Sequence, residues 1–348
     1  MLGKSGIIVG KMFSYLKGLY MHAVFLDYKT VDAGDLDLAS IKALLPEMEV
    51  YPYSNEDEVL DRIANTEVAI ANKIEFDSEV FAHAKNLKLI CVTATGTNNI
   101  DLVSAENSGV TVCNIRDYCT ESVMQHVLLS ILSLTHSYPN YMNSIRKGEW
   151  QDGSSFSLLK HSIAELSGEK LGIVGFGVLG KGVAKAAALL GMELLVCRSF
   201  QPNNRSDNLI NRVTFDELLK ESDVISLHCP LTNKTEGLFN DEAFKKMKSS
   251  AILVNTARGG LIDDHALIEA IENQSIAGAA IDVLDQEPPG SDHPLMQNSY
   301  PNLIITPHIA WAAREARQRA IDRIAENVEA FQKGSPINVV KPRGTSGN

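Results

Sequence analysis

The chain has 348 residues, of which 45% are apolar and 22% are charged, so its length and composition suit two globular domains with sizeable cores. Lysine and arginine number 32 against 43 aspartates and glutamates, which gives a formal net charge of −11 spread along the chain. This balance offers no basic stripe that could neutralise phosphates, and no apolar run approaches the roughly 20 residues of a membrane span. We therefore expect no nucleic-acid partner and no membrane partner.

The chain has five cysteines, an odd number. They show no C-x-x-C spacing, and most of them lie inside apolar runs. This usage predicts reduced core thiols in a cytoplasmic protein, with neither a disulfide framework nor a metal site. The cysteines are Cys91, Cys113, Cys119, Cys197 and Cys229.

The first twenty residues differ from the rest of the chain, because lysines at positions 4, 11 and 17 interrupt every apolar stretch. No small-residue cleavage site follows a continuous apolar region, which argues against a secretory signal. A second methionine, Met21, directly precedes the first strand-like run. We expect residues 1–20 to be a dispensable leader.

From Met21 onward, short β-rich apolar runs alternate with amphipathic stretches. The first series of runs occupies residues 23–27, 68–72, 87–93 and 110–114, with helical patterns such as Glu56–Asn65 and Ser78–Ala84 between them. A long apolar helix is predicted over Thr120–Thr135, whereas residues 138–168 fit no clean pattern. The second series occupies residues 170–176, 193–197, 223–229, 251–255, 277–283 and 303–306, and a helical pattern follows at Trp311–Phe331. This alternation predicts an α/β fold with two Rossmann-like domains, each built on a parallel sheet.

A glycine-rich segment lies between the first strand of the second series and a helical run, Lys181–Leu190. Its residues, Gly175-Phe176-Gly177-Val178-Leu179-Gly180, match the pattern G-x-G-x-x-G. In this context the glycines permit a tight turn and a close backbone approach to a pyrophosphate at a helix N-terminus. The alternative is an ordinary strand–helix turn, and we favour a dinucleotide site.

The acid that usually follows the second strand of such a domain is absent here, and Arg198-Ser199 stands in its place. That acid accepts hydrogen bonds from the ribose hydroxyls and repels a 2′-phosphate. A cation and a hydroxyl suit a phosphate instead, which predicts NADP(H) in preference to NAD(H). The alternative is that Arg198 stacks beside the adenine and leaves both cofactors usable.

Polar groups follow several apolar runs at the point where each run ends, and ligands bind at the carboxyl ends of strands in open α/β sheets. A guanidinium can grip a carboxylate, and a histidine beside an acid can give or take a proton near neutral pH. With a nicotinamide cofactor, this set predicts reversible reduction of a 2-keto acid to a 2-hydroxy acid. The groups are the loop Ala94–Asn99, Arg258, Asp282, Glu287 and His308.

Each of these residues also has a purely structural interpretation. His308 could be a core histidine, Glu287 could start the Pro-Pro turn, and Arg258 could pair with a surface acid. We favour one site because all three follow strand ends.

Six segments together resemble the D-isomer-specific 2-hydroxyacid dehydrogenases, and two of them resemble glycerate dehydrogenases (hydroxypyruvate reductases) in particular. The likeness spans about residues 21 to 335. The segments are TATGTNNID (93–101), GFGVLG (175–180), SLHCPLT (226–232), VNTARGGLID (254–263), AIDVLDQEP (280–288) and TPHIAWA (306–312).

The resemblance implies that Arg258 binds substrate, that Glu287 is the acid paired with the histidine, and that His308 is the acid/base and also contacts substrate. It implies that backbone amides at Thr95, Gly96 and Thr97 contact the substrate carboxylate. The cofactor residues that we expect are Arg198 and Ser199, from their place after the second strand, and, from the motifs, Gly175, Phe176, Gly177, Val178, Leu179, Gly180, His228, Cys229, Pro230, Thr256, Ala257, Asp282, His308 and Ala310.

The resemblance also implies a discontinuous architecture. Residues 21–118 and 311–348 would form the substrate domain, and residues 119–310 would form the inserted dinucleotide-binding domain. A homodimer would form through the helix near 120–135 and the segment after it.

The function expected from these features is reduction of hydroxypyruvate or glyoxylate to D-glycerate or glycolate. Two alternatives stay open at this point: a phosphoglycerate dehydrogenase-like enzyme, and a dinucleotide-sensing protein similar to corepressors of this fold.

Overall fold

The computed structural model describes residues 21–200, 212–297 and 299–342, so the proposed leader, residues 1–20, lies outside the described residues. The chain divides into two compact units, and it passes between them after Cys119 and again after Trp311. We call the part before and after these crossings unit 1, and residues 120–311 unit 2. Both units contain a parallel sheet with helical connections, which confirms the predicted α/β class.

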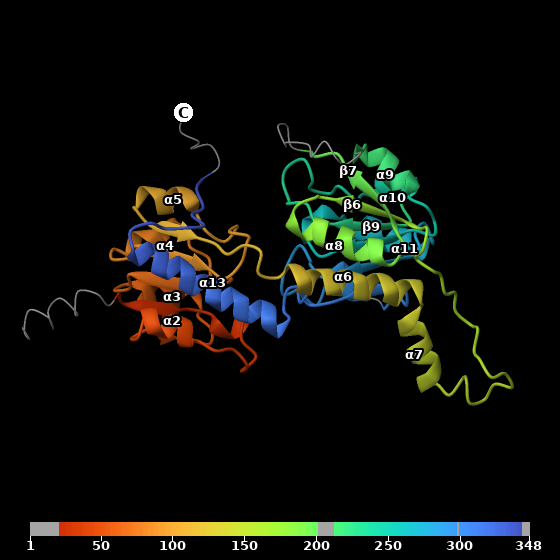
Figure 1. Ribbon diagram of the computed structural model, residues 1–348, viewed down its shortest axis with the longest axis horizontal. Coiled ribbons are helices and arrows are strands. Elements are labelled where there is room, and N and C mark those ends of the chain that lie inside the picture. Colours follow the sequence, from red (N-terminus) through yellow and green to blue (C-terminus); the bar gives the residue numbers. More distant parts are fainter. Residues whose placement is uncertain (1–20, 201–211, 298, 343–348) are drawn as a thin grey trace, which may run out of the picture. The chain divides into compact units, whose positions relative to one another are not determined.

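Unit 1 is built on a five-stranded parallel sheet with the order β2-β1-β3-β4-β5. Its central strands are apolar throughout and fully buried, as parallel strands covered on both faces must be. Helix α13 returns to this unit at the end of the chain and packs against α2 (Figure 1). The elements are β1 (Ala23–Phe25), β2 (Glu49–Val50), β3 (Val68–Ala71), β4 (Leu89–Val92), β5 (Thr111–Cys113), the 3-10 turn Tyr28–Thr30, α2 (Ala39–Leu44), α3 (Glu56–Ile63), α4 (Ser78–His83), α5 (Leu102–Asn107) and α13 (Arg314–Gln332).

Unit 2 is built on a seven-stranded parallel sheet with the order β12-β11-β10-β9-β6-β7-β8. The strands are β6 (Lys170–Val174), β7 (Glu193–Cys197), β8 (Arg212–Val213), β9 (Val224–Leu227), β10 (Ile252–Asn255), β11 (Gly278–Ile281) and β12 (Leu303–Ile305). The chain reverses its direction across the sheet between β6 and β9, which is where open α/β sheets bind ligands.

Helices α6 and α8 contact each other and pack on strands of this sheet (Figure 1), while α9, α10 and α11 contribute to its buried apolar core. The helices are α6 (Thr120–Thr135), α7 (Tyr138–Arg146), α8 (Val178–Leu189), α9 (Phe215–Glu221), α10 (Asp241–Lys246), α11 (Asp264–Glu272) and α12 (Pro294–Gln297), with a 3-10 turn at Gly259–Leu261.

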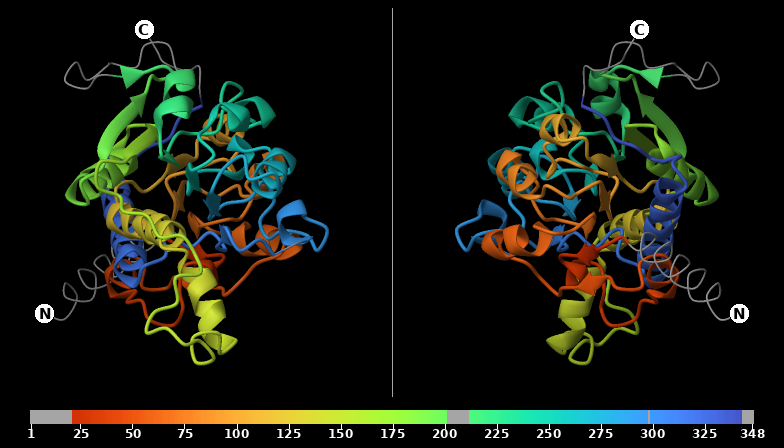
Figure 2. Two further views of the ribbon diagram at one scale, coloured as in Figure 1. Left: turned by 90° about the vertical axis from the view of Figure 1, so that its right-hand side faces the viewer. Right: turned by 90° about the vertical axis from the view of Figure 1, so that its left-hand side faces the viewer.

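The segment without a clean sequence pattern contains α7, which begins beside Pro139, and then a long irregular stretch. We call residues 138–163 the arm, and Figure 2 shows that it stands off the sheet of its own unit. It carries the two most exposed large apolar side chains of the described residues, Phe156 at 92% and Leu159 at 86% exposure. Burial against its own unit therefore cannot account for these side chains.

None of the five cysteines, all of which lie in the described ranges, forms a disulfide, and four of them are buried. No helix within the described ranges is both long enough and apolar enough to cross a membrane.

Candidate active site

The glycine-rich turn connects β6 to α8, and each of its three glycines has a separate structural reason. Gly175 has φ of +99°, and a Cβ there would lie 2.4 Å from the backbone nitrogen of Cys229. A Cβ on Gly180 would lie 2.2 Å from the carbonyl oxygen of Gly175, so the first and third glycines pack together. Around Gly177, which caps α8, no atom of a described residue other than its two chain neighbours lies within 4 Å of the Cβ position. The turn is thus closed on the protein side and open at the helix N-terminus, as a pyrophosphate site requires.

Two neighbouring strand ends carry buried polar atoms that lack a partner among the described residues. These are Nδ1 of His228, after β9, and Oγ1 of Thr256, after β10. Burial lowers the pKa of His228 to about 4, so its ring is neutral at physiological pH and can accept a hydrogen bond. Buried polar groups in native proteins nearly always have partners. The open turn and these two atoms fit a dinucleotide cofactor.

The predicted site residues follow strands that are neighbours in the sheet. His308 follows β12, Glu287 follows β11 and Arg258 follows β10, while the glycine turn and Arg198 follow β6 and β7. Since all strands are parallel, their carboxyl ends meet at one edge of the sheet. The three ionisable residues therefore lie toward one end of that edge, the glycine-rich turn lies near its middle, and Arg198 lies toward the other end.

His308 and Glu287 form a close pair, with 2.6 Å between Nδ1 of the histidine and Oε2 of the acid. A carboxylate can only accept this hydrogen bond, so Nδ1 of His308 carries the hydrogen. Nε2 is then the ring nitrogen that can exchange a proton with a ligand. The other carboxylate oxygen accepts the N–H of Leu284 at 2.9 Å, which holds the acid in place. Both side chains are 29% exposed, so the pair is reachable from solvent.

The Arg258 turn is fastened by Asn255, a fully buried residue to which the sequence analysis assigned no role. Asn255 donates to the carbonyl oxygen of Arg258 at 2.8 Å and accepts the N–H of Ala257 at 3.0 Å. Within the described part of the chain, the Arg258 guanidinium forms no ion pair, and its recorded hydrogen bond is to the Ala257 carbonyl. The alternative in which Arg258 forms an ion pair with a surface acid is therefore not supported by these residues.

Gly259 joins the Arg258 turn to the loop that carries Glu287. A Cβ at Gly259 would lie 2.0 Å from the carbonyl carbon of Leu284 and 2.2 Å from the nitrogen of Asp285. The two backbones are thus in direct contact, and only glycine allows it. The sequence alone could not show this contact, because the two segments are about 25 residues apart.

Asp282 is almost fully buried, and its carboxylate faces the His308 loop. Oδ1 accepts the N–H of Ile309 at 2.9 Å, and Oδ2 accepts the N–H of Ala310 at 2.8 Å. The carbonyl oxygen of Asp282 accepts the N–H of His308 itself at 2.8 Å. These bonds support His308 in a left-handed conformation with φ of +53°.

The remaining predicted residues fall in three places. Arg198 and Ser199 are exposed directly after β7, where Arg198 Nε donates to the carbonyl oxygen of Arg212. Pro230 follows β9 and is exposed. Thr95, Gly96 and Thr97 follow β4 in unit 1, where Thr95 donates to the carbonyl oxygen of Ile115.

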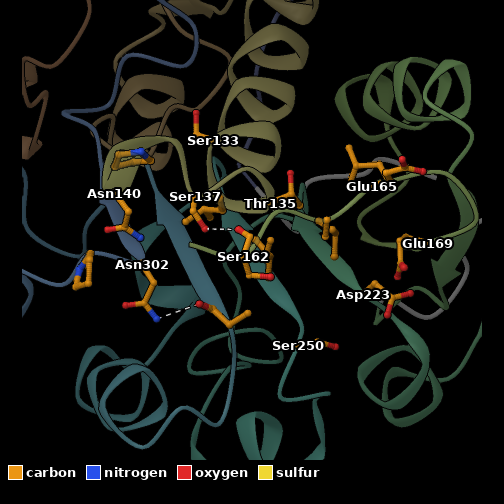
Figure 3. A pocket seen from close by; sticks show the side chains of 18 residues that line it. Ser133, Thr135, Ser137, Asn140, Ser162, Glu165, Glu169, Asp223, Ser250 and Asn302 are labelled. Carbon is orange, nitrogen blue, oxygen red and sulfur yellow. Dashed lines mark hydrogen bonds between the residues drawn. The ribbon is translucent and has the colours of Figure 1, made fainter. Parts of the chain in front are cut away.

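A cavity of about 430 Å³ lies at the opposite edge of the unit 2 sheet (Figure 3). Its lining includes Glu169, Asp223 and Asn302, each of which directly precedes a strand. The hydrogen bond with Asp223 raises the pKa of Glu169. Because this cavity is at the amino ends of the strands, it is separate from the residues described above.

Comparison with known proteins identifies the family of this chain. The family model for the NAD binding domain of D-isomer specific 2-hydroxyacid dehydrogenases matches residues 128–310. The chain is 40% identical to a glycerate dehydrogenase of Methylorubrum extorquens, over 91% of this chain and 98% of that one. It is 37% identical to a hydroxypyruvate reductase of Blautia hydrogenotrophica, over 92% and 99%. A solved acyclic imino acid reductase in complex with NADPH and D-Arg has a TM-score of 0.80 at 27% identity, over 92% and 100%. This chain therefore belongs to the D-isomer specific 2-hydroxyacid dehydrogenases.

Proposed function

We propose that the protein reduces hydroxypyruvate or glyoxylate with a nicotinamide cofactor, and that unit 2 binds the dinucleotide. The observation that carries this proposal is the His308–Glu287 pair, which follows β12 and β11 beside the Arg258 turn on β10. The names of the two curated relatives support small 2-keto acids as the substrate class.

In this proposal, the Arg258 guanidinium binds the substrate carboxylate and orients the keto group. Backbone amides at Thr95–Thr97 are proposed as further contacts to the carboxylate. The nicotinamide, when bound, supplies the hydride. His308 delivers the proton from Nε2 to the ketone oxygen, and Glu287 stabilises the charged ring through its bond to Nδ1.

The glycine turn, His228, Cys229, Pro230, Thr256, Ala257, Asp282 and Ala310 are proposed to hold the cofactor in unit 2. The backbone N–H groups at the start of α8 suit its phosphates, and the unpartnered atoms of His228 and Thr256 are available for its polar groups.

A substrate panel tests the proposal. Initial rates are measured with hydroxypyruvate, glyoxylate, pyruvate and 3-phosphohydroxypyruvate, each with NADPH and with NADH. Turnover of the first two with the highest kcat/KM supports the proposal. A preference for the phosphorylated acid would favour the phosphoglycerate alternative, and no turnover of any 2-keto acid would favour a dinucleotide-sensing protein.

We propose that NADPH is preferred over NADH, because Arg198 and Ser199 follow β7 where an acid would repel a 2′-phosphate. Arg198→Asp should lower kcat/KM for NADPH by about 10- to 100-fold, the loss of one or two charge-assisted hydrogen bonds, and raise it for NADH. Lys185→Asp, on α8, is the control for a change of charge. Equal or NADH-favouring values in the wild type would overturn the preference.

The chain is proposed to form a homodimer through α6 and the arm. The arm is held together by its own bonds, such as that from Tyr141 Oη to the carbonyl oxygen of His161, yet its apolar side chains face solvent. Exposed apolar surface of this kind marks an association site.

A cytoplasmic location, inferred from the cysteines, is likewise a proposal.

Leu159→Asp should therefore weaken the dimer, because it puts a charge into an apolar interface. Leu189→Asp is a matched control, since Leu189 is 85% exposed on α8. Sedimentation equilibrium measures the mass of both variants. The proposed interface would be wrong if the wild type sediments as a monomer or if both variants behave alike.

A further inference from the structure

Two polar side chains of α6 hold the loop that carries His308, one on each side of it. Ser122 Oγ donates to the carbonyl oxygen of Ala310 at 2.7 Å. His126 Nε2 lies 3.2 Å from Oγ1 of Thr306. Ser122 and His126 are four residues apart, so they lie on the same face of the helix. Helix α6 is therefore hydrogen-bonded to both ends of the segment 306–310.

The direction of the His126 bond follows from its partners. Thr306 Oγ1 donates its single hydrogen to Oδ1 of Asp282 at 2.5 Å, and this carboxylate also accepts the two backbone N–H groups described above. Thr306 Oγ1 can therefore only accept from His126, which means that Nε2 of His126 carries a hydrogen. The same Nε2 is 3.7 Å from Oδ1 of Asp282. The result is a hydrogen-bond network in which His126 donates to Thr306 and Thr306 donates to Asp282.

This hydrogen-bond network ends at the backbone of the loop that carries His308. The carboxylate of Asp282 is 1% exposed, and a buried carboxylate is stable only when donors surround it. Its position fixes Ile309 and Ala310, and thereby the left-handed backbone of His308, a conformation that is unfavourable for a residue other than glycine. Loss of a donor at the far end should let the loop relax and move the imidazole.

The location of these contacts in the chain is also informative. Ser122 is the third residue of α6, which begins directly after the first crossing between the units. Ala310 is the second-last residue before the other crossing. The bond from Ser122 to Ala310 thus ties the two crossings together next to His308.

We propose that His126 and Ser122 are positioning residues for His308, and this inference rests on the proposed function of His308. Neither side chain touches substrate or cofactor in the proposal. They act by holding Thr306, Asp282 and Ala310, and so set the direction of the imidazole.

The test compares His126→Gln with His126→Asn. Both amides can donate a hydrogen bond, but only the longer glutamine places its nitrogen near the position of Nε2. His126→Asn should lower kcat by about 10- to 100-fold, which is the usual effect of a small misplacement of a catalytic group. Its KM values for the 2-keto acid and for the cofactor should stay within about threefold of those of the wild type. His126→Gln should stay within about threefold of the wild type. Equal kcat in the two variants, or a loss in KM alone, would overturn the proposal.

Ser122→Ala and Ser130→Ala form a second matched pair. Both serines are buried on α6, but among the described residues the Ser130 hydroxyl bonds within its own helix, to the carbonyl oxygen of His126. Ser122→Ala should lower kcat by about 3- to 10-fold, and Ser130→Ala should not. Similar losses in both would indicate a general weakening of the helix and contradict the proposal. This pair decides the question even if His126→Asn fails to fold.

Hydrogen exchange separates this proposal from the proposed function. The amides of His308, Ile309 and Ala310 should exchange at least 10-fold faster in His126→Asn than in His126→Gln, with the α11 amides unchanged. If the wild type reduces no 2-keto acid, the proposed function fails while the exchange result still stands. Equal exchange in the two variants would overturn the positioning role itself.

Discussion

His308→Gln should lower kcat for reduction of the preferred 2-keto acid by about 10²- to 10⁴-fold, which is the usual contribution of a general acid. Glutamine keeps a polar group of similar length, but it cannot deliver a proton at neutral pH. The bond from Nδ1 to Glu287 shows that the ring is already oriented by an acid, so its second nitrogen is the one available for transfer. The measurement is steady-state kinetics with saturating cofactor.

Cofactor affinity should stay nearly constant in this variant, because the proposed phosphate-binding turn follows β6, whereas His308 follows β12. Fluorescence titration with NADPH and NADH measures it directly. His265→Gln is the control, since His265 is an exposed histidine on α11 of the same unit. Turnover of His308→Gln similar to that of the wild type would assign proton transfer to another group.

Arg258→Lys should raise KM for the 2-keto acid by about 10- to 100-fold, with a smaller effect on kcat. Lysine keeps the positive charge but loses the planar pair of donors that a carboxylate accepts, and a hydrogen bond to a charged group contributes about 1.5 to 3 kcal/mol. The turn itself should survive, because Asn255 holds it through the backbone of residues 257 and 258.

Arg323→Lys is the matched control for this change. Arg323 forms a surface ion pair with Glu326 on α13, where a lysine can serve as well. Its KM should equal that of the wild type. An unchanged KM in Arg258→Lys would mean that another group binds the carboxylate, and a loss confined to kcat would mean that Arg258 acts mainly on the transition state.

Much of the fold was predictable because it depends on short-range patterns. Buried parallel strands are apolar along most of their length, so runs such as Val68–Ala71 and Leu89–Val92 were visible as strands. The strand–glycine–helix order predicted the glycine-rich turn between β6 and α8 for the same reason. The arm was different: α7 was missed, because this helix lies in a polar, turn-rich stretch. The two-residue strands β2 and β8 were too short to form a pattern.

The candidate site was predictable only as a set of residues. The sequence by itself determined that Arg258, Glu287 and His308 follow strands, and parallel strands bring their carboxyl ends to one edge. Only the tertiary structure decided how these residues are held. The contact of Gly259 with Leu284 and the bonds from α6 to residues 306 and 310 join segments that are distant in the chain. No local pattern encodes such contacts, because close packing and the pairing of buried polar groups depend on which segments meet in three dimensions.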